Sequence, residues 1–447
     1  MKIWRAERST RAQVRFLSSA TSSTAGHAAG LFFPLDLALN LRAESYSPWI
    51  LERLEWAGGN LESFQQGSTA IHKTLELEIT PQGLCALTEK LGRERAIQRD
   101  ADVAAFQSGE LQARHVEAPP VAMAMLDGGM AQVRASEAAP GVHEPAWTET
   151  KVANISTYTD VHFEEDPQPE PPEKFLDPPK VAKLIQQMKG SSGAARAKGK
   201  RQRVKPEAPE APEPAHERTS PKRKLRTVVA TTKSCDEFGP MVAAEVMRRG
   251  FFGAKKKGAV GDGSLWIWGI VAMYLVGFTP ILDFVHLLVH LYAAAQAAHK
   301  DSSGKAWSLY VELLNLGWKG KVTKLLDLLK KHAQRLGEPP EDCAEDDPRK
   351  IVARVIHYVD TNKDKMDYPR YRREGLPISS APMESLIKQV SRRVKGTEKF
   401  WIRDGLEAVL QVRAAHLSED DRVEAHWAKR PLGRAAGRSL FRRAAAA

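Results

Sequence analysis

Three acidic residues, far apart along the chain, are the side chains best suited to chemistry. They lie in the motifs Leu-Asp127-Gly-Gly, Gly-Asp262-Gly and Ala-Pro-Met-Glu384-Ser, each at the end of a strand-like run or the start of a helix. Separated carboxylates that converge in a fold can hold two divalent cations, which activate an oxygen nucleophile and stabilise the leaving oxygen at a phosphodiester. We therefore expect these three carboxylates to lie within about 4–8 Å of one another, with two Mg²⁺ or Mn²⁺ ions as the cofactors.

Each acid also has a simpler interpretation. Asp127 with its two following glycines is typical of a hairpin turn, and it predicts one strand over 121–126 and a returning strand over 130–134. Asp262 between two glycines is likewise a common turn. Glu384 would lie in the first turn of a helix, where a carboxylate complements the helix dipole.

Four basic residues follow Glu384 on the helix expected from Pro382 to Lys395. They are Lys388, Arg392, Arg393 and Lys395. Cations behind a metal-binding acid suit a phosphodiester backbone that runs along the helix, so we predict that these residues bind DNA. The alternative is pairing of Glu and Lys within the helix, worth only about 0.2–0.5 kcal/mol per pair.

Asp283 and His286 form an Asp-x-x-His pair where a strand runs into a helix. They have two possible accessory roles, as metal ligands or as groups that orient a metal-binding carboxylate. His290, one helical turn later on an apolar face, is expected to be a core histidine.

The composition points to a polyanionic partner. Lys and Arg exceed Asp and Glu by 66 to 55, for a net charge of +11, which favours nucleic acid first and an acidic membrane surface second. The three cysteines are far apart and form no CxxC pair, which argues against a disulfide framework and a cysteine-based zinc module. Without an apolar leader at residues 1–20, we expect a cytoplasmic, nucleoid-associated protein.

One segment imitates a membrane span. Residues 264–282 carry no charge, and this length reaches the threshold for a transmembrane helix. Gly277 and Pro280 interrupt the run, and Asp262 and Asp283 bracket it. We therefore expect a helix and a strand in a protein core, and no membrane.

The N-terminal part of the chain predicts a small helical module. Ser47-Pro48 and Thr80-Pro81 are helix starts, and Gly58-Gly59 ends the first helix. Three short helices here are compatible with a helix-turn-helix DNA reader, and equally with a helical bundle used for packing or dimerisation.

The rest of the chain predicts a mixed α/β core with an all-helical insertion. Strand-like runs come first, then strands alternate with helices, and a helical block precedes the last acid. Residues 164–224 are rich in proline and charge, which predicts a linker with one helix from Val181 to Met188. The expected organisation is: 1–30 disordered N-terminus, 31–115 helical DNA-binding module, 116–163 first part of the core, 164–224 linker, 225–300 second part of the core, 301–378 helical insertion, 379–425 C-terminal core helices, and 426–447 basic disordered tail.

The segment from Tyr368 to Trp401 strongly resembles the C-terminal motif of ISKra-type insertion-sequence transposases, relatives of the Mutator group. The resemblance extends over most of residues 31–422 and includes the motifs around Asp127, Asp262 and Asp283. It implies an RNase H-like fold similar to that of retroviral integrases, with Asp127, Asp262 and Glu384 as a DDE triad.

The resemblance also assigns Asp283 and His286 to the family's accessory motif and the 122 residues between Asp262 and Glu384 to its helical insertion. This chain differs from the family in one respect, because some relatives have upstream cysteines for a zinc-binding DNA module and this chain lacks such a set. Trp401 would lie near DNA or pack against the helix that carries Glu384, and of these two positions we expect packing.

These observations predict a DDE transposase of a bacterial insertion sequence. It would act on transposon terminal inverted repeats and target DNA as a homodimer or higher oligomer, cutting the ends and joining them by transesterification. One alternative in the same fold is a nuclease without end recognition. Two others lack catalysis: an inactive or truncated relic that only binds DNA, and a DNA-binding regulator that uses the N-terminal helices.

Overall fold

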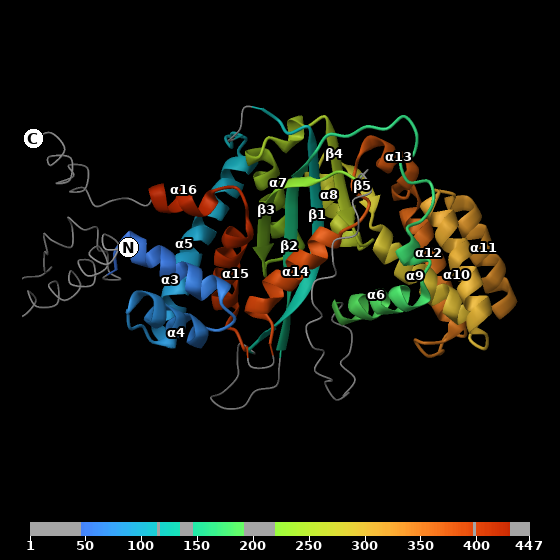
Figure 1. The fold of residues 1–447 in the computed structure, drawn as a ribbon, viewed down its shortest axis with the longest axis horizontal. Helices are drawn as coiled ribbons and strands as arrows, with labels where there is room; N and C mark the ends of the chain where they lie inside the picture. Colours follow the sequence, from blue (N-terminus) through green and yellow to red (C-terminus); the bar gives the residue numbers. More distant parts are fainter. Residues whose placement is uncertain (1–45, 114–116, 135–145, 192–219, 397–398, 430–447) are drawn as a thin grey trace, which may run out of the picture. The chain divides into compact units, whose positions relative to one another are not determined.

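A computed structural model describes residues 46–113, 117–134, 146–191, 220–396 and 399–429 (Figure 1). The N-terminus expected to be disordered, most of the basic tail and the basic run of the linker at 198–203 lie outside these residues. The three cysteines are free thiols.

The chain divides into two compact units. The first contains the described residues of Met1–Asp100, Gln132–Trp147 and Gln389–Ala447, and the second contains those of Ala101–Ala131 and Thr148–Lys388. All the candidate carboxylates belong to the second unit.

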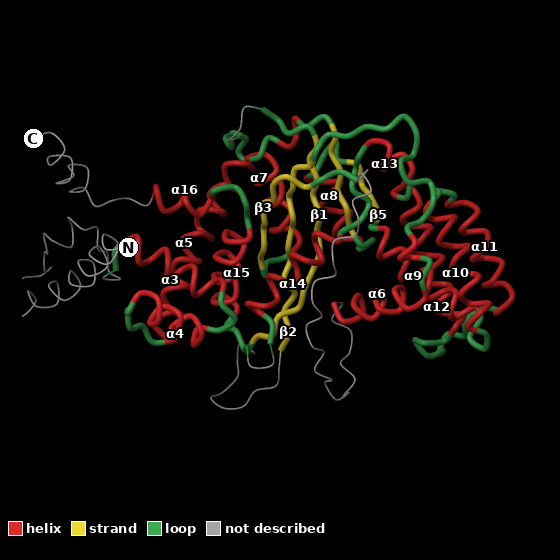
Figure 2. The backbone as a smooth tube through the Cα atoms, in the orientation of Figure 1, coloured by secondary structure: helices red, strands yellow, loops and turns green. Residues whose placement is uncertain are grey.

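A five-stranded mixed sheet runs through the described residues, with its strands side by side in Figure 2. The strands are β1 (Val121–Val133), β2 (Ala146–Tyr158), β3 (Arg223–Thr231), β4 (Lys256–Gly261) and β5 (Thr279–Leu282). Their order is β3-β2-β1-β4-β5, with β2 antiparallel to β3 and with β1, β4 and β5 parallel. Together with the helices this is a mixed α/β fold.

The hairpin predicted at Asp127-Gly128-Gly129 is wrong. β1 continues without a turn through both glycines to Val133. A Cβ at Gly128 would lie 2.9 Å from Oε1 of Glu149 on the neighbouring strand, and one at Gly129 would lie 3.1 Å from Oγ1 of Thr150. The glycines therefore provide space beside β2, and strand pairing overrides the local turn preference.

Alternate residues of β1 face opposite sides of the sheet. Ala122, Ala124 and Leu126 belong to a core cluster with side chains of α7 (Cys235–Arg248) and α8 (Leu265–Tyr274). Because side chains along a strand alternate between the two faces, Met123, Met125 and Asp127 point to the face opposite that cluster.

A block of helices follows the sheet, in which α9, α10, α11 and α12 lie side by side (Figure 1). This part of the chain contains α9 (Phe284–Ala298), α10 (Ser303–Trp318), α11 (Val322–Leu336), α12 (Pro348–Asn362), α13 (Tyr368–Glu374) and α14 (Ala381–Val394). Short 3₁₀ turns are η2 (Glu173–Phe175), η3 (Phe251–Gly253) and η4 (Lys363–Lys365). The helix predicted in the linker is present as α6 (Pro178–Ser191).

The first unit is helical around its own core of leucines, which includes Leu54, Leu84 and Leu91. Its helices are α3 (Pro48–Asn60), α4 (Phe64–Leu75), the first part of α5 (Pro81–Gln107), the end of α14, α15 (Arg403–Leu417) and α16 (Arg422–Lys429). Ser47 caps α3 as predicted. The third helix differs from the prediction, because α5 is long at 27 residues.

Among the described helices, none is long and apolar enough to cross a membrane. The uncharged segment that imitates a span folds as α8 and β5, and Ile267, Ile270 and Val271 of α8 are buried in the core cluster.

Candidate functional site

Three aspartates occupy one row across the sheet. The register pairs Met125 of β1 with Val260 of β4, and Val260 in turn with Ile281 of β5. Each of these paired residues is followed two positions later by an aspartate: Asp127, Asp262 and Asp283. Because neighbouring strands lie about 4.8 Å apart and side chains alternate with a period of two, all three aspartates are placed close together and are directed to the same face of the sheet.

Asp127 and Asp262 form the electrostatic centre of this row. Burial raises the pKa of Asp127 to about 7, and the neighbouring Asp262 carboxylate adds to the increase. Oδ1 of Asp127 accepts a hydrogen bond from the backbone N–H of Gly128 (2.7 Å), and Oδ1 of Asp262 accepts one from Ser264 N–H (2.8 Å). Both bonds come from backbone amides and leave the remaining acceptor sites of the two carboxylates available for a cation.

Asp283 has a different role, because its carboxylate is fully buried and its bonds are internal. Oδ1 accepts from the N–H of Val285 (3.0 Å) and of Ser380 (3.2 Å), while Oδ2 accepts from the Ser380 hydroxyl (2.5 Å) and contacts Nδ1 of His286 (2.6 Å). Burial alone would raise its pKa, but these partners outweigh it and lower the pKa. Of the two roles left open by the sequence, this geometry favours orientation of neighbours over metal ligation.

His286 is held protonated by the acids around it. Burial acts to lower its pKa, but the bond to Asp283 and the charges of Asp283, Asp262 and Asp127 raise it to about 9. A protonated imidazole beside two carboxylates partly compensates their negative charge.

Asp283 also fixes the start of the helix that carries Glu384. Besides the two bonds from Ser380, Phe284 N–H donates to the carbonyl of Ile378 (3.0 Å), so the start of α9 is joined to the segment that precedes α14. Glu384 then lies in the first turn of α14, half-buried. Burial raises its pKa and Asp283 adds to this, whereas His286 and Lys388 lower it.

The four acids of the predicted site are therefore brought around His286, but they do not form a closed cage. Asp127 and Asp262 interact with each other, while the charges that act on Glu384 come from Asp283, His286 and Lys388. As the side chains of the described residues stand, no group of three His, Cys, Asp or Glu side chains could hold a metal ion. The donor chemistry nevertheless fits hard cations such as Mg²⁺, because the acids supply oxygen donors and a cation would relieve the repulsion at Asp127.

Tyr358 of the helical insertion supports the turn at Asp262, and no motif in the sequence indicates this contact. The hydroxyl of Tyr358 on α12 donates to the backbone carbonyl of Asp262 (2.7 Å), and its ring stacks on His290 of α9 with centroids 3.9 Å apart. Gly263 has φ +102°, and a Cβ there would lie 2.5 Å from the Tyr358 ring, so this close approach requires glycine. Burial lowers the pKa of His290 to about 4, which keeps that ring neutral against Tyr358.

The basic residues of α14 separate into two groups. Lys388 and Arg392 are exposed and Lys395 is half-buried, so these side chains are accessible to a polyanion. Arg393 is only 2% exposed, and the prediction that it binds DNA is corrected here. Its guanidinium lies 4.3 Å from the ring centroid of Phe64 and its Nε donates to the Gly58 carbonyl (2.7 Å), so it stabilises the first unit.

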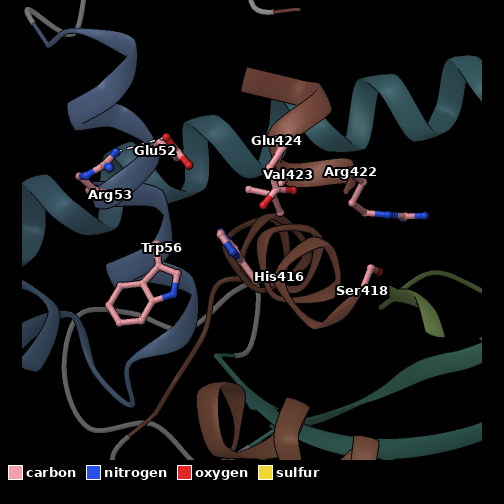
Figure 3. A pocket seen from close by; sticks show the side chains of 8 residues that line it. All are labelled: Glu52, Arg53, Trp56, His416, Ser418, Arg422, Val423 and Glu424. Atoms are coloured by element: carbon pink, nitrogen blue, oxygen red, sulfur yellow. Dashed lines mark hydrogen bonds and ion pairs between the residues drawn. The ribbon is translucent and has the colours of Figure 1, made fainter. Parts of the chain in front are cut away.

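Trp401 packs as predicted. Its indole N–H donates to the carbonyl of Val394 at the end of α14 (2.8 Å), its ring lies edge-on to Phe64, and only 8% of the residue is exposed. The first unit also contains a hollow of about 330 Å³ (Figure 3). It is lined by Glu52, Arg53, Trp56, His416, Ser418, Arg422, Val423 and Glu424, and none of the candidate carboxylates reaches it.

Neither the models of known protein families nor the curated proteins give a match to this sequence.

Proposed function

We propose that the chain is a DDE-type transposase of an insertion sequence, which cuts transposon DNA ends and joins them to target DNA. The observation that carries the proposal is the pair Asp127 and Asp262, aligned by register at neighbouring parallel strands, with a pKa near 7 on Asp127. Keeping two carboxylates together in a partly buried site is unfavourable unless a cation or proton compensates them, and such arrangements are concentrated at functional sites.

An RNase H-like core is the finer fold that we propose. The order β3-β2-β1-β4-β5, with one acid on β1 and the next directly after the parallel strand β4, supports it. The helical block between Asp262 and Glu384 supports the ISKra-type resemblance, in which an insertion separates the second and third acids.

Asp127, Asp262 and Glu384 are the residues that would hold two Mg²⁺ or Mn²⁺ ions. When bound, such ions activate an oxygen nucleophile and stabilise the leaving oxygen of a phosphodiester. Asp283 would position His286 and, through Ser380, the start of α14, while Tyr358 would hold the Asp262 turn. Water would first cleave at the transposon end, and the freed 3′-hydroxyl would then form a new P–O bond in target DNA while the target's own 3′-oxygen leaves.

DNA contact is proposed for the exposed cations of α14. Lys388 is one turn after Glu384, so a phosphate bound there would lie next to the candidate third acid. We expect Lys388→Ala to weaken binding to all DNA sequences alike and to reduce the slope of log Kd against log salt by about one.

The proposal is tested by Mg²⁺- and Mn²⁺-dependent cleavage and strand transfer, with DNA that flanks the gene as the donor. Wild type is compared with Glu384→Gln and with Glu374→Gln, which makes the same change on α13 outside the acid row. Metal-dependent products that Glu384→Gln loses and Glu374→Gln keeps would support the transposase. Equal activity in all three proteins would refute the role of Glu384, and binding without cleavage would support the relic that only binds DNA.

A further inference from the structure

α8 carries an exposed apolar face that the proposed catalysis does not use. Leu265 is 76% exposed and Met273 is 69% exposed. Gly269 and Ala272 lie between them on the same face at 100° per residue, and Val276, 71% exposed, follows in the turn after the helix. We call these five residues the α8 stripe; the opposite face of the helix is buried in the core cluster.

The glycine in the middle of the stripe has no explanation within the chain. A Cβ at Gly269 would meet no atom within 4 Å, so alanine would fit there. Glycine inside a helix is unfavourable compared with alanine. An open glycine at an exposed helix position leaves room for the backbone of a second helix to approach closely.

The charge pattern narrows the kind of partner. No Lys, Arg, Asp or Glu occurs between residues 264 and 282. Nucleic acid would require cations on the surface that it contacts, so the stripe is unsuited to DNA. A contiguous apolar patch without charge is typical of a protein interface.

The spacing of large and small residues makes the stripe complementary to itself. Leu265 precedes Gly269 by four residues and Met273 follows it by four, so these two large side chains are symmetric about the glycine. Two such helices crossed antiparallel about a two-fold axis at Gly269 would place Leu265 of each copy against Met273 of the other. In a two-fold interface the same patch is used by both subunits, and this pattern meets that requirement.

We propose that the α8 stripe is the contact between two copies of this chain, with Gly269 at the two-fold axis. The three large side chains expose apolar surface on the order of 200–300 Å² per copy. Two copies would bury about 500 Å² through the stripe, compared with about 1,200–2,000 Å² in a stable specific interface. Residues around the stripe must add to the contact, and we expect a dimer with a Kd in the micromolar range, ~1–100 µM.

The first test measures the mass of the full-length protein as a function of concentration by analytical ultracentrifugation without DNA. Met273→Glu should raise the dimer Kd at least tenfold, because it places a charge in the contact. Ile97→Glu is the matched control, since Ile97 is 70% exposed on α5 and this substitution likewise replaces an exposed apolar side chain with a carboxylate. A wild-type protein that stays monomeric to about 500 µM, or an equal effect of both variants, would overturn the proposal.

The second test reports the geometry through disulfide formation in a protein whose Cys85, Cys235 and Cys343 are replaced by Ser. Gly269→Cys should form a disulfide-linked dimer under mild oxidation, because residues at a two-fold axis meet their own copies. Gly304→Cys on α10 is the control, since that glycine is also exposed with no atom within 4 Å of its Cβ position.

The outcomes of the disulfide test are distinct from those of the cleavage assay. Dimer formation by Gly269→Cys well above that of Gly304→Cys supports the axis. If Gly269→Cys is slow to react even with a small thiol reagent, another segment of the same chain, such as the apolar run at 31–41, covers the stripe. That result, or equal dimer formation by both variants, overturns the proposal whether or not the protein cuts DNA.

Discussion

Replacement of Asp127 by Asn should stabilise the metal-free protein at alkaline pH. Burial and the Asp262 carboxylate raise the pKa of Asp127 from 3.8 to about 7. A folded-state pKa above the unfolded value means that the native protein holds the proton more tightly. Stability from this group is therefore complete below pH 3.8 and is lost as the pH rises through about 7. Asn cannot ionise, so the variant avoids this loss and still accepts the bond from Gly128.

The size of the effect follows from the pKa difference. The shift is about 7 − 3.8 = 3.2 pH units, which at 1.36 kcal/mol per unit sets a ceiling of about 4 kcal/mol. Relaxation of the site and the coupled charges of Asp262 and His286 make the actual effect smaller than this ceiling. We therefore expect Asp127→Asn to raise the free energy of unfolding by about 1–3 kcal/mol at pH 8. The gain should shrink toward zero as the pH approaches 4.

The assay is urea denaturation with EDTA at pH 4.5 and pH 8. Asp166→Asn is the matched control, because burial of Asp166 is outweighed by its bonds to Arg372 (2.8 and 2.5 Å) and its pKa is lowered. A lowered pKa gives stability that is present above pH 3.8 and lost as the pH falls, so Asp166→Asn should destabilise at pH 8. The same chemical change is thus expected to have opposite signs at the two positions.

The reasoning would be refuted if the Asp127→Asn variant is no more stable than wild type at pH 8 while the Asp166→Asn variant is destabilised as expected. It would mean that the Asp127 carboxylate has no unfavourable interaction in the native state. Added Mn²⁺ should raise the Tm of wild type at pH 8 and should raise that of Asp127→Asn much less, because a ligand stabilises only the state that binds it.

Three further substitutions test the contacts around the acids and in the first unit. Asp283→Asn should lower the pKa of His286 from about 9 to 6.5 or below, measured by NMR titration of the imidazole, since burial would then dominate; an unchanged pKa would contradict the role of Asp283. Tyr358→Phe should lower the free energy of unfolding in urea by about 0.5–1.5 kcal/mol, because the bond to the Asp262 carbonyl is lost. It should also weaken Mn²⁺ binding measured by EPR, and an unchanged Mn²⁺ affinity would restrict Tyr358 to packing. Arg393→Ala should lower the free energy of unfolding by about 2–4 kcal/mol by chemical denaturation, as expected for a large buried side chain; a change below 0.5 kcal/mol would contradict its structural role.

Much of the secondary structure was predictable because its signals are local. The helices that start at Ser47-Pro48 and Thr80-Pro81, and the helix and strand expected within residues 264–282, are present. Hydrophobic runs, caps and prolines act on near neighbours, so one sequence is sufficient to read them. The hairpin at Asp127 failed because the same glycines that suit a turn also make room for side chains of β2.

The long-range contacts of the site were less predictable. Tyr358 and Asp262 are separated by 96 residues, and nothing in the spacing indicates that a tyrosine of the helical block reaches the Asp262 carbonyl. Arg393 illustrates the same difficulty, because a helical residue between exposed cations appears solvent-accessible until its neighbours Phe64 and Trp401 are known. Strand register, by contrast, explains why three aspartates in separate motifs form one row.

The boundaries between the two units fall inside regular elements. Asp100 lies within α5, Ala131 within β1, Trp147 within β2 and Lys388 within α14. Neither unit is therefore a continuous stretch of chain that could be cut out at a linker. Recombination between genes could not exchange the helical unit as a single cassette, since three separated segments would have to change together. Changes on the surface of this unit would have to arise by point substitutions, in steps that keep both cores intact.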